Sequence, residues 1–210
     1  MLQTIDAYED ILHIHQAKDK NILKESYLMS AYIWDFKISN NIDALETFLY
    51  NPLLKVFGKY DMIFFPIRHG FEDHYTLTLL DTIEGKWYHY NPRLSKNGNL
   101  HTPCFNDVVQ LSKMVMEFLK HHKKVQDMHF LRELLSRVYS TLIVFDCGVL
   151  VLYYMEHMSK MWLIMENFNE DELLEYKATC VGAFLNDESN LNGRIHRPPT
   201  YSQGYLNIQN

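Results

Sequence analysis

The hydrophobic positions of this chain repeat with a helical period near its start and form short, strongly apolar runs in its middle. Residues 4–17 and 25–36 each place apolar side chains at helical spacing, which predicts two amphipathic helices. A third short helix is predicted over 41–50, where Asn41 or Asp43 can cap the N-terminus while the apolar side chains face inward.

Short runs rich in aromatic and β-branched residues follow, and turn signals separate them. Residues 60–67 predict a central strand closed by its proline, and residues 74–81 and 86–91 predict two more strands. Glu84-Gly85 lies between the last two runs and predicts a hairpin turn. The middle of the chain is therefore expected to form an antiparallel β-meander.

The remainder of the chain returns to helical patterning. Residues 106–122 form an amphipathic pattern with Asn106 as its N-cap. Residues 128–138 fit either a short helix or an extended piece, and 169–185 begins with acidic residues that suit a helix N-terminus. The order of helices, meander and helices indicates an α+β fold.

Length, composition and charge narrow the class of protein. The chain has 210 residues, 47% of them apolar, so it can bury a sizeable core. We expect one domain over residues 1–185 and, because Asn, Ser, Gly and Pro are frequent in 186–210, a loosely ordered C-terminal tail. A net charge of −6 argues against a dedicated nucleic-acid-binding module.

The cysteines and the apolar runs bear on the cellular compartment. Cys104, Cys147 and Cys180 are odd in number and lack metal-ligand spacing, so the sequence predicts neither a disulfide framework nor a metal site. Cys104 and Cys180 are interpreted as packing residues. The N-terminus has no signal-peptide pattern, and no apolar run approaches the roughly 18 residues of a membrane span. We therefore expect an intracellular protein without a membrane segment.

Cys147 stands at the start of a predicted buried helix. The unpaired N–H groups and the macrodipole at a helix N-terminus favour negative charge, and this placement lowers the pKa of a thiol. A structural cysteine on a core helix is the alternative interpretation. The preceding residue, Asp146, can either shape the turn by accepting backbone hydrogen bonds or serve as the N-cap.

A cysteine nucleophile needs a histidine within hydrogen-bond reach, and that histidine needs a third group to hold its ring. His74 opens a predicted strand directly after a polar turn at 68–73, and Asn91 closes the neighbouring hairpin strand. A hairpin brings the start of one strand alongside the end of the next, so His74 and Asn91 are predicted neighbours. The Cys147 helix, packed at that end of the sheet, would complete a Cys–His–Asn arrangement. A strand-edge histidine without a role and a turn-forming asparagine are the alternatives.

These residues resemble a known family. The resemblance extends over residues 4 to 158, including the first predicted helix. It is to the ubiquitin-like-protein-specific (SUMO-type) cysteine proteases, and this chain resembles the divergent plant-type members of that family most. It implies a papain-like fold with a central meander sheet flanked by helices, cleavage after the Gly-Gly terminus of a small modifier, no cofactor, and a place in the nucleus or cytoplasm. The matching runs are Phe64-Phe65-Pro66-Ile67, His74-Tyr75-Thr76-Leu77, Asn91 seventeen positions after His74, and Asp146-Cys147-Gly148-Val149.

The resemblance also implies roles for single residues. Cys147 matches the nucleophile and His74 the general base. Asn91 stands where the family usually has Asp, which keeps an orienting hydrogen bond but removes a charge that would stabilise the imidazolium. Thr141 stands at the position of a Gln that supports the oxyanion, and losing one such donor costs about 3–4 kcal/mol in well-studied proteases. Tyr75 replaces one of two Trp residues that line the tunnel for Gly-Gly.

Three hypotheses follow for the function. The first is a thiol peptidase or isopeptidase acting on a SUMO-like ubiquitin-like modifier. The second is a catalytically impaired member that serves as a modifier-binding module, which Asn91 and Thr141 favour. The third, an acetyltransferase on the same scaffold, ranks low because the sequence has no feature of an acyl-CoA site. The pattern indicates neither which modifier is recognised nor the oligomeric state.

Overall fold

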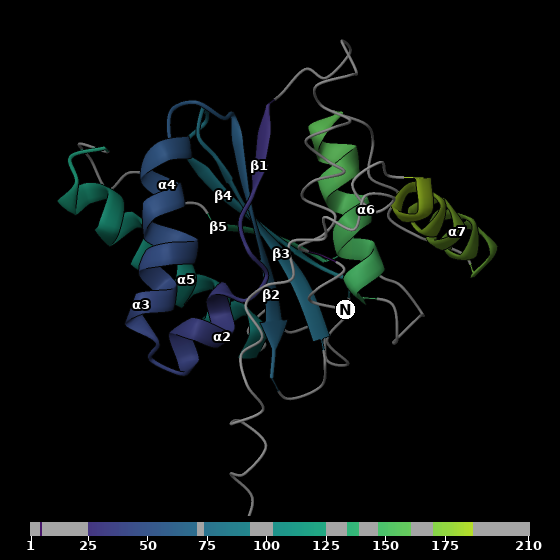
Figure 1. The fold of residues 1–210 in the computed structure, drawn as a ribbon, viewed down its shortest axis with the longest axis horizontal. Helices are drawn as coiled ribbons and strands as arrows, with labels where there is room; N and C mark the ends of the chain where they lie inside the picture. Colours follow the sequence, from purple (N-terminus) through teal and green to yellow (C-terminus); the bar gives the residue numbers. More distant parts are fainter. Residues whose placement is uncertain are drawn as a thin grey trace, which may run out of the picture.

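A mixed β-sheet forms the centre of the computed structural model (Figure 1). The structure describes residue 5 and residues 25–70, 74–92, 103–124, 134–138, 147–160 and 170–186. Within these residues five strands follow one another in chain order across the sheet. The inner three are antiparallel, which confirms the predicted meander, while the two outer strands each run parallel to their neighbour. The strands are β1 (Ser26–Leu28), β2 (Met62–His69), β3 (His74–Asp81), β4 (Lys86–Asn91) and β5 (Leu134–Val138).

Helices cover both faces of the sheet (Figure 1). One face carries α2 (Ile33–Ile38), α3 (Ile42–Leu45), the π-helical turn η1 (Glu46–Tyr50), α4 (Asn51–Val56) and α5 (Pro103–His121). The other carries α6 (Cys147–Ser159), and α7 (Glu170–Asn186) packs on the side of α6 that faces away from the sheet. The fold is therefore the predicted α+β arrangement of a sheet flanked by helices.

The alternation of side chains along the strands divides the core in two. In β2, Met62 and Phe64 pack into the cluster that contains α6, whereas Ile63 and Phe65 pack into the cluster that contains α5. Both faces of β2 and β3 are buried because helices cover both. β2 therefore reads as a nearly continuous hydrophobic run, whereas β3 also buries the polar side chains of His74, Thr76 and Thr78.

The hairpin between β3 and β4 is stabilised by its own side chains. The Asp81 carboxylate accepts hydrogen bonds from the backbone N–H groups of Ile83 and Glu84, at 3.0 and 2.8 Å. Gly85 follows with a φ of 66°, a left-handed conformation that favours glycine. This turn sets the register of β3 against β4, and so the positions of His74 and Asn91.

The prediction of a helix over residues 25–36 is wrong for the first half of that segment. Residues 26–28 are extended and pair with Met62–Phe64 of β2, and only α2, from Ile33, is helical. The apolar spacing of this segment fits a helix, but Leu28 and its neighbour Met29 are buried in the two different clusters. Burial on opposite sides of the sheet therefore overrides the local pattern.

Pro66 does not close its strand as predicted, because β2 continues to His69. On one side β2 is paired with β1 only as far as Phe64, so the missing N–H of Pro66 costs no ladder bond there. The helix predicted over 106–122 begins earlier than expected, at Pro103, and Asn106 is an exposed residue inside it rather than its cap.

The remaining segments follow the predictions or lie outside the described residues. Asn41 caps α3 as expected, its side chain accepting a hydrogen bond from the Ala44 N–H at 3.1 Å. The segment 128–138 contributes a strand, β5, and 169–185 corresponds to α7. Of the helix predicted over 4–17 only Ile5 is described, helical and fully buried, and the tail 186–210 lies outside the description beyond Asn186.

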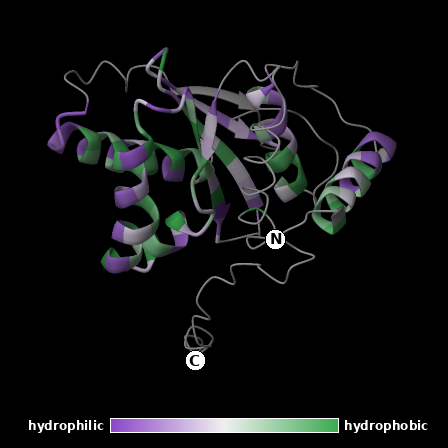
Figure 2. Cartoon of the chain, turned by 45° about the horizontal axis from the view of Figure 1, so that its top comes forward, coloured by the Kyte–Doolittle hydropathy of each residue, from purple (hydrophilic) through white to green (hydrophobic). Residues whose placement is uncertain are grey.

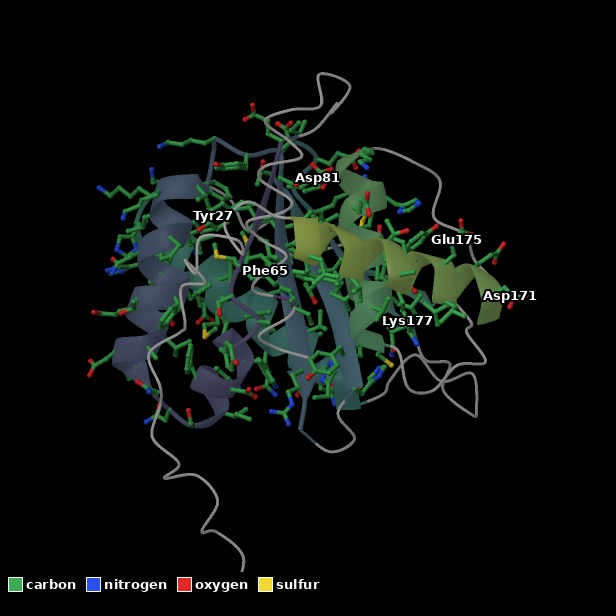
Figure 3. The ribbon with its side chains drawn as sticks, turned by 45° about the vertical axis from the view of Figure 1, so that its right-hand side comes forward. Tyr27, Phe65, Asp81, Asp171, Glu175 and Lys177 are labelled. Atoms are coloured by element: carbon green, nitrogen blue, oxygen red, sulfur yellow. The ribbon has the colours of Figure 1, made fainter. Side chains whose placement is uncertain are left out.

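Helix α5 is amphipathic, whereas α6 is buried along most of its length. In α5, Val108, Leu111, Val115 and Leu119 are buried, and hydrophilic and hydrophobic residues alternate along this layer in Figure 2. Asp171 and Glu175 of α7 are exposed and point away from the rest of the molecule (Figure 3). None of the helices in the described ranges is long and apolar enough to cross a membrane.

We predict that Phe65→Ala strongly destabilises the fold. Phe65 is 1% exposed and its ring lies 5.5 Å from that of Trp87, so truncation removes buried contacts and leaves a cavity (Figure 3). The expected loss in the free energy of unfolding is about 3–5 kcal/mol, measured by urea denaturation. Ile83→Ala, at a side chain 66% exposed, is the control and should change it by less than about 0.5 kcal/mol. Equal losses in the two variants would contradict this packing.

Candidate active site

The register of the meander brings His74 and Asn91 together. Leu77 pairs with Tyr90, and continuing that register places Asn91 opposite Thr76, two residues from His74 on the same face of the sheet. Diagonal neighbours of this kind lie within reach of long side chains. The His74 Nε2 and Asn91 Oδ1 atoms are 2.8 Å apart, and both residues are buried.

Cys147 reaches the same point from another element. It is the first residue of α6, which packs against β3, and its Sγ lies 3.0 Å from the Nδ1 atom of His74. The side chain is buried, with the residue 5% exposed. Three residues that are far apart in the sequence thus make one hydrogen-bonded chain from thiol to imidazole to amide.

The amide of Asn91 determines which ring nitrogen of His74 faces the thiol. Because the amide oxygen can only accept, the His74 Nε2–H donates to it, and the unprotonated Nδ1 is left to accept from the Cys147 S–H. Burial lowers the pKa of His74, and the hydrogen bond to Asn91 opposes that change. The neutral tautomer is therefore oriented to take the thiol proton.

This arrangement can generate a nucleophile. Transfer of the proton from Cys147 Sγ to His74 Nδ1 gives a thiolate beside an imidazolium, and the helix N-terminus favours the negative sulfur.

Among the residues that the structure describes, no group of three or more His, Cys, Asp and Glu side chains could hold a metal ion.

Comparison with protein families agrees with this chemistry. Residues 17–169 match the model of the Ulp1 protease family, C-terminal catalytic domain, which is most of the chain. The chain belongs to the Ulp1 protease family. As a member it is a cysteine protease domain, and the thiol–imidazole contact agrees with that class. No curated protein sequence matches it.

Solved structures with a similar fold include Ulp1-family proteases of low sequence identity. The C-terminal Ulp1 protease domain in complex with Smt3, the yeast orthologue of SUMO, superposes with a TM-score of 0.64 at 17% identity, covering 87% of this chain and 74% of that one. The Xanthomonas campestris effector XopD bound to ubiquitin gives 0.56 at 15% identity, covering 85% and 89%. These matches support the Ulp1-like fold.

Of the other residues predicted to matter, some lie in the described part of the chain and some do not. Tyr75 follows His74 in β3 and is 6% exposed in the α6 cluster, and Cys180 is buried in the same cluster. Burial raises the pKa of the Cys180 thiol to about 11, as expected for a packing residue. Thr141 and Asp146 lie outside the described residues.

A second buried polar group lies beside His74, and it was not predicted from the sequence. His69 is fully buried in β2, pairs directly with His74 across the strands, and contacts Asp107 of α5. His89 of β4 is also buried on this face, with its ring 6.3 Å from that of Phe105 in α5. Alternation in the strands could have revealed the group, because His89 precedes Asn91 by two residues. His69 was missed because residues 68–73 were predicted to be a turn, whereas β2 continues to His69.

We predict that the protein loses stability as the pH falls below about 6.5. Burial lowers the pKa of His89 from 6.5 to about 3 and also lowers the pKa values of His69 and His74. The unfolded chain then binds protons that the folded chain does not, so stability is full above the ordinary histidine pKa and is lost below it. Each such histidine contributes up to about 1.4 kcal/mol per pH unit.

Urea denaturation at about pH 7, 6 and 5 measures this slope. His89→Gln should make the slope shallower, whereas His122→Gln, at an exposed residue of the α5 C-terminal end, should leave it unchanged. A free energy of unfolding that stays constant over this range would show that the histidines titrate alike in the folded and unfolded states.

Proposed function

We propose that this chain is a cysteine peptidase or isopeptidase that cleaves after the C-terminal Gly-Gly of a SUMO-like ubiquitin-like modifier. The observation that carries the proposal is the continuous chain of contacts from Cys147 to His74, at 3.0 Å, and from His74 to Asn91, at 2.8 Å. In a Ulp1-family domain this chain is the geometry that thiol hydrolysis requires.

In the proposed mechanism the Cys147 proton moves to His74 Nδ1, and the thiolate attacks the carbonyl carbon of the last glycine. His74 then gives the proton to the leaving amine as the C–N bond breaks, which leaves a thioester on Sγ. A water molecule, deprotonated by His74, attacks the thioester and releases the modifier with a free carboxylate. Asn91 holds the ring in place throughout both steps.

Supporting roles are proposed for three further residues. The backbone N–H of Cys147, at the start of α6, would donate to the oxyanion, with Thr141 as a second donor and Asp146 shaping the turn. Tyr75 would line the tunnel for Gly-Gly, and its place in the same buried cluster as Cys147 supports this role.

The choice of a modifier as substrate is supported by what similar structures bind. One of them holds Smt3, a SUMO orthologue, and another holds ubiquitin. A Gly-Gly terminus is common to such modifiers and requires a narrow approach to the thiol, in keeping with the burial of all three residues. We further propose that residues 1–185 are the catalytic domain and that it acts in the nucleus or cytoplasm.

The alternative is an impaired member that binds the modifier without cleaving it. A neutral amide at Asn91 stabilises the imidazolium less than a carboxylate would, and Thr141 would reach the oxyanion less well than Gln. Both features lower activity without removing the nucleophile or its base.

We predict that a vinyl-sulfone derivative of a ubiquitin-like modifier forms a covalent adduct on Cys147. The reaction requires the thiolate, so His74→Ala should slow adduct formation by about a hundredfold or more. Mass spectrometry of the intact protein and of its peptides identifies the modified residue. Cys104→Ser serves as the matched control and should react at the unchanged rate, since this second buried cysteine lies in α5 and not at the start of α6.

The outcomes separate the two functions. An adduct with one modifier establishes the protease and identifies its partner. If the folded protein binds a modifier but forms no adduct with any vinyl sulfone, the proposal of a peptidase fails and the binding module replaces it.

A further inference from the structure

A second imidazole lies against His74 on the side of the sheet covered by α5. His69 and His74 are directly paired residues of β2 and β3, and their rings stack at 5.8 Å with an interplanar angle of 28°. His69 is fully buried, so it cannot be a solvated surface residue. Its ring must therefore find all of its hydrogen-bond partners inside the protein.

Both nitrogens of His69 have partners. The Nδ1–H donates to the Asp107 carboxylate at 2.7 Å, and Nε2 lies 2.9 Å from the hydroxyl of Thr76, which donates to it when His69 is neutral. The two bonds hold the ring on one side of His74, as Asn91 holds His74 itself. Asp107 comes from the first turns of α5, so this helix is tied directly to the catalytic end of the sheet.

The charge of this group is negative while His69 is neutral. Burial lowers the pKa of His69, against the raising effects of the hydrogen bond and the charge of Asp107. The pair then carries the single negative charge of the carboxylate, whose side chain is 22% exposed, so water screens it only in part. A negative charge near His74 favours the imidazolium that forms when Cys147 gives up its proton.

We propose that Asp107, acting through His69, is a positioning residue that places beside His74 the negative charge that Asn91 does not supply. The group thereby stabilises the thiolate–imidazolium pair of Cys147 and His74. This inference rests on the proposed function, since it assigns a role within the same site.

Other charged or titratable residues also lie near His74 in the structure or in the sequence. Arg68, next to His69 in β2, has its guanidinium 3.8 Å from the carboxylate of Asp35 in α2, so the two charges offset each other. His89 in β4 stays neutral at physiological pH because burial lowers its pKa to about 3. Glu72 and Asp73, which precede His74, lie outside the described residues.

The test is the pH dependence of Cys147 alkylation by iodoacetamide, followed by peptide mass spectrometry. Asp107→Asn removes the charge but keeps an oxygen that can accept from His69. We expect the midpoint of thiolate formation to move to higher pH, and the alkylation rate at neutral pH to fall on the order of fivefold. Glu117→Gln, the same change at an exposed position of α5, should leave the midpoint in place. Asp107→Glu, which keeps the charge, should retain most of the rate.

A second comparison separates charge from structure. Asn91→Asp places a carboxylate directly on His74 and should move the midpoint to lower pH. In that background Asp107→Asn should still move the midpoint to higher pH, because the effects of two separate charges on the imidazolium add. An Asp107→Asn protein whose midpoint is unchanged in both backgrounds would overturn the proposal.

The same assay distinguishes failure of this inference from failure of the proposed function. If His74→Ala leaves Cys147 alkylation unchanged, Cys147 and His74 do not form a reactive pair and the peptidase assignment fails. If His74→Ala abolishes the reaction at neutral pH while Asp107→Asn does not shift it, only the role of Asp107 fails.

Discussion

The pairing register of β3 with β4 is the constraint on which the site depends. Because side chains alternate along a strand, a slip of one residue would turn either His74 or Asn91 to the other face of the sheet. The Asp81 and Gly85 turn sets this register from the far end of the hairpin. The site therefore rests on a turn at the opposite end of both strands, and the helices on either face keep the hairpin in place.

The site also requires polar groups to be buried in an otherwise apolar core. His69, His74 and Asn91 lie within the sheet, with Thr76 among them, and each forms a hydrogen bond to a neighbouring strand or helix. Such a network is costly when one member lacks a partner and rigid when all are satisfied. The bonds to Asp107 and Cys147 come from α5 and α6, so the network also joins the two helix layers through the sheet.

Sequence patterns predicted the meander, the helices after it and the meeting of His74 with Asn91, since each follows from local periodicity and from the geometry of a hairpin. Two features depend on long-range pairing and escaped prediction. The strand Ser26–Leu28 exists only because β2 pairs with it, and its local pattern resembles a helix. The bond between His69 and Asp107 joins residues of β2 and α5 for which the sequence offers no motif.

The neutral amide of Asn91 and the pair formed by buried His69 and partly exposed Asp107 together suggest how such a site can tolerate the loss of a carboxylate. A charge contributes to an imidazolium over a longer range than a hydrogen bond does, and the fully buried His69 keeps water from between Asp107 and His74. Orientation and charge can therefore come from different residues. Asn91 orients the His74 ring through its amide oxygen, while the Asp107 carboxylate, hydrogen-bonded to the neighbouring His69, supplies the negative charge. On this view the replacement of Asp by Asn divides the task of one residue between two elements of the fold, and it need not remove catalysis.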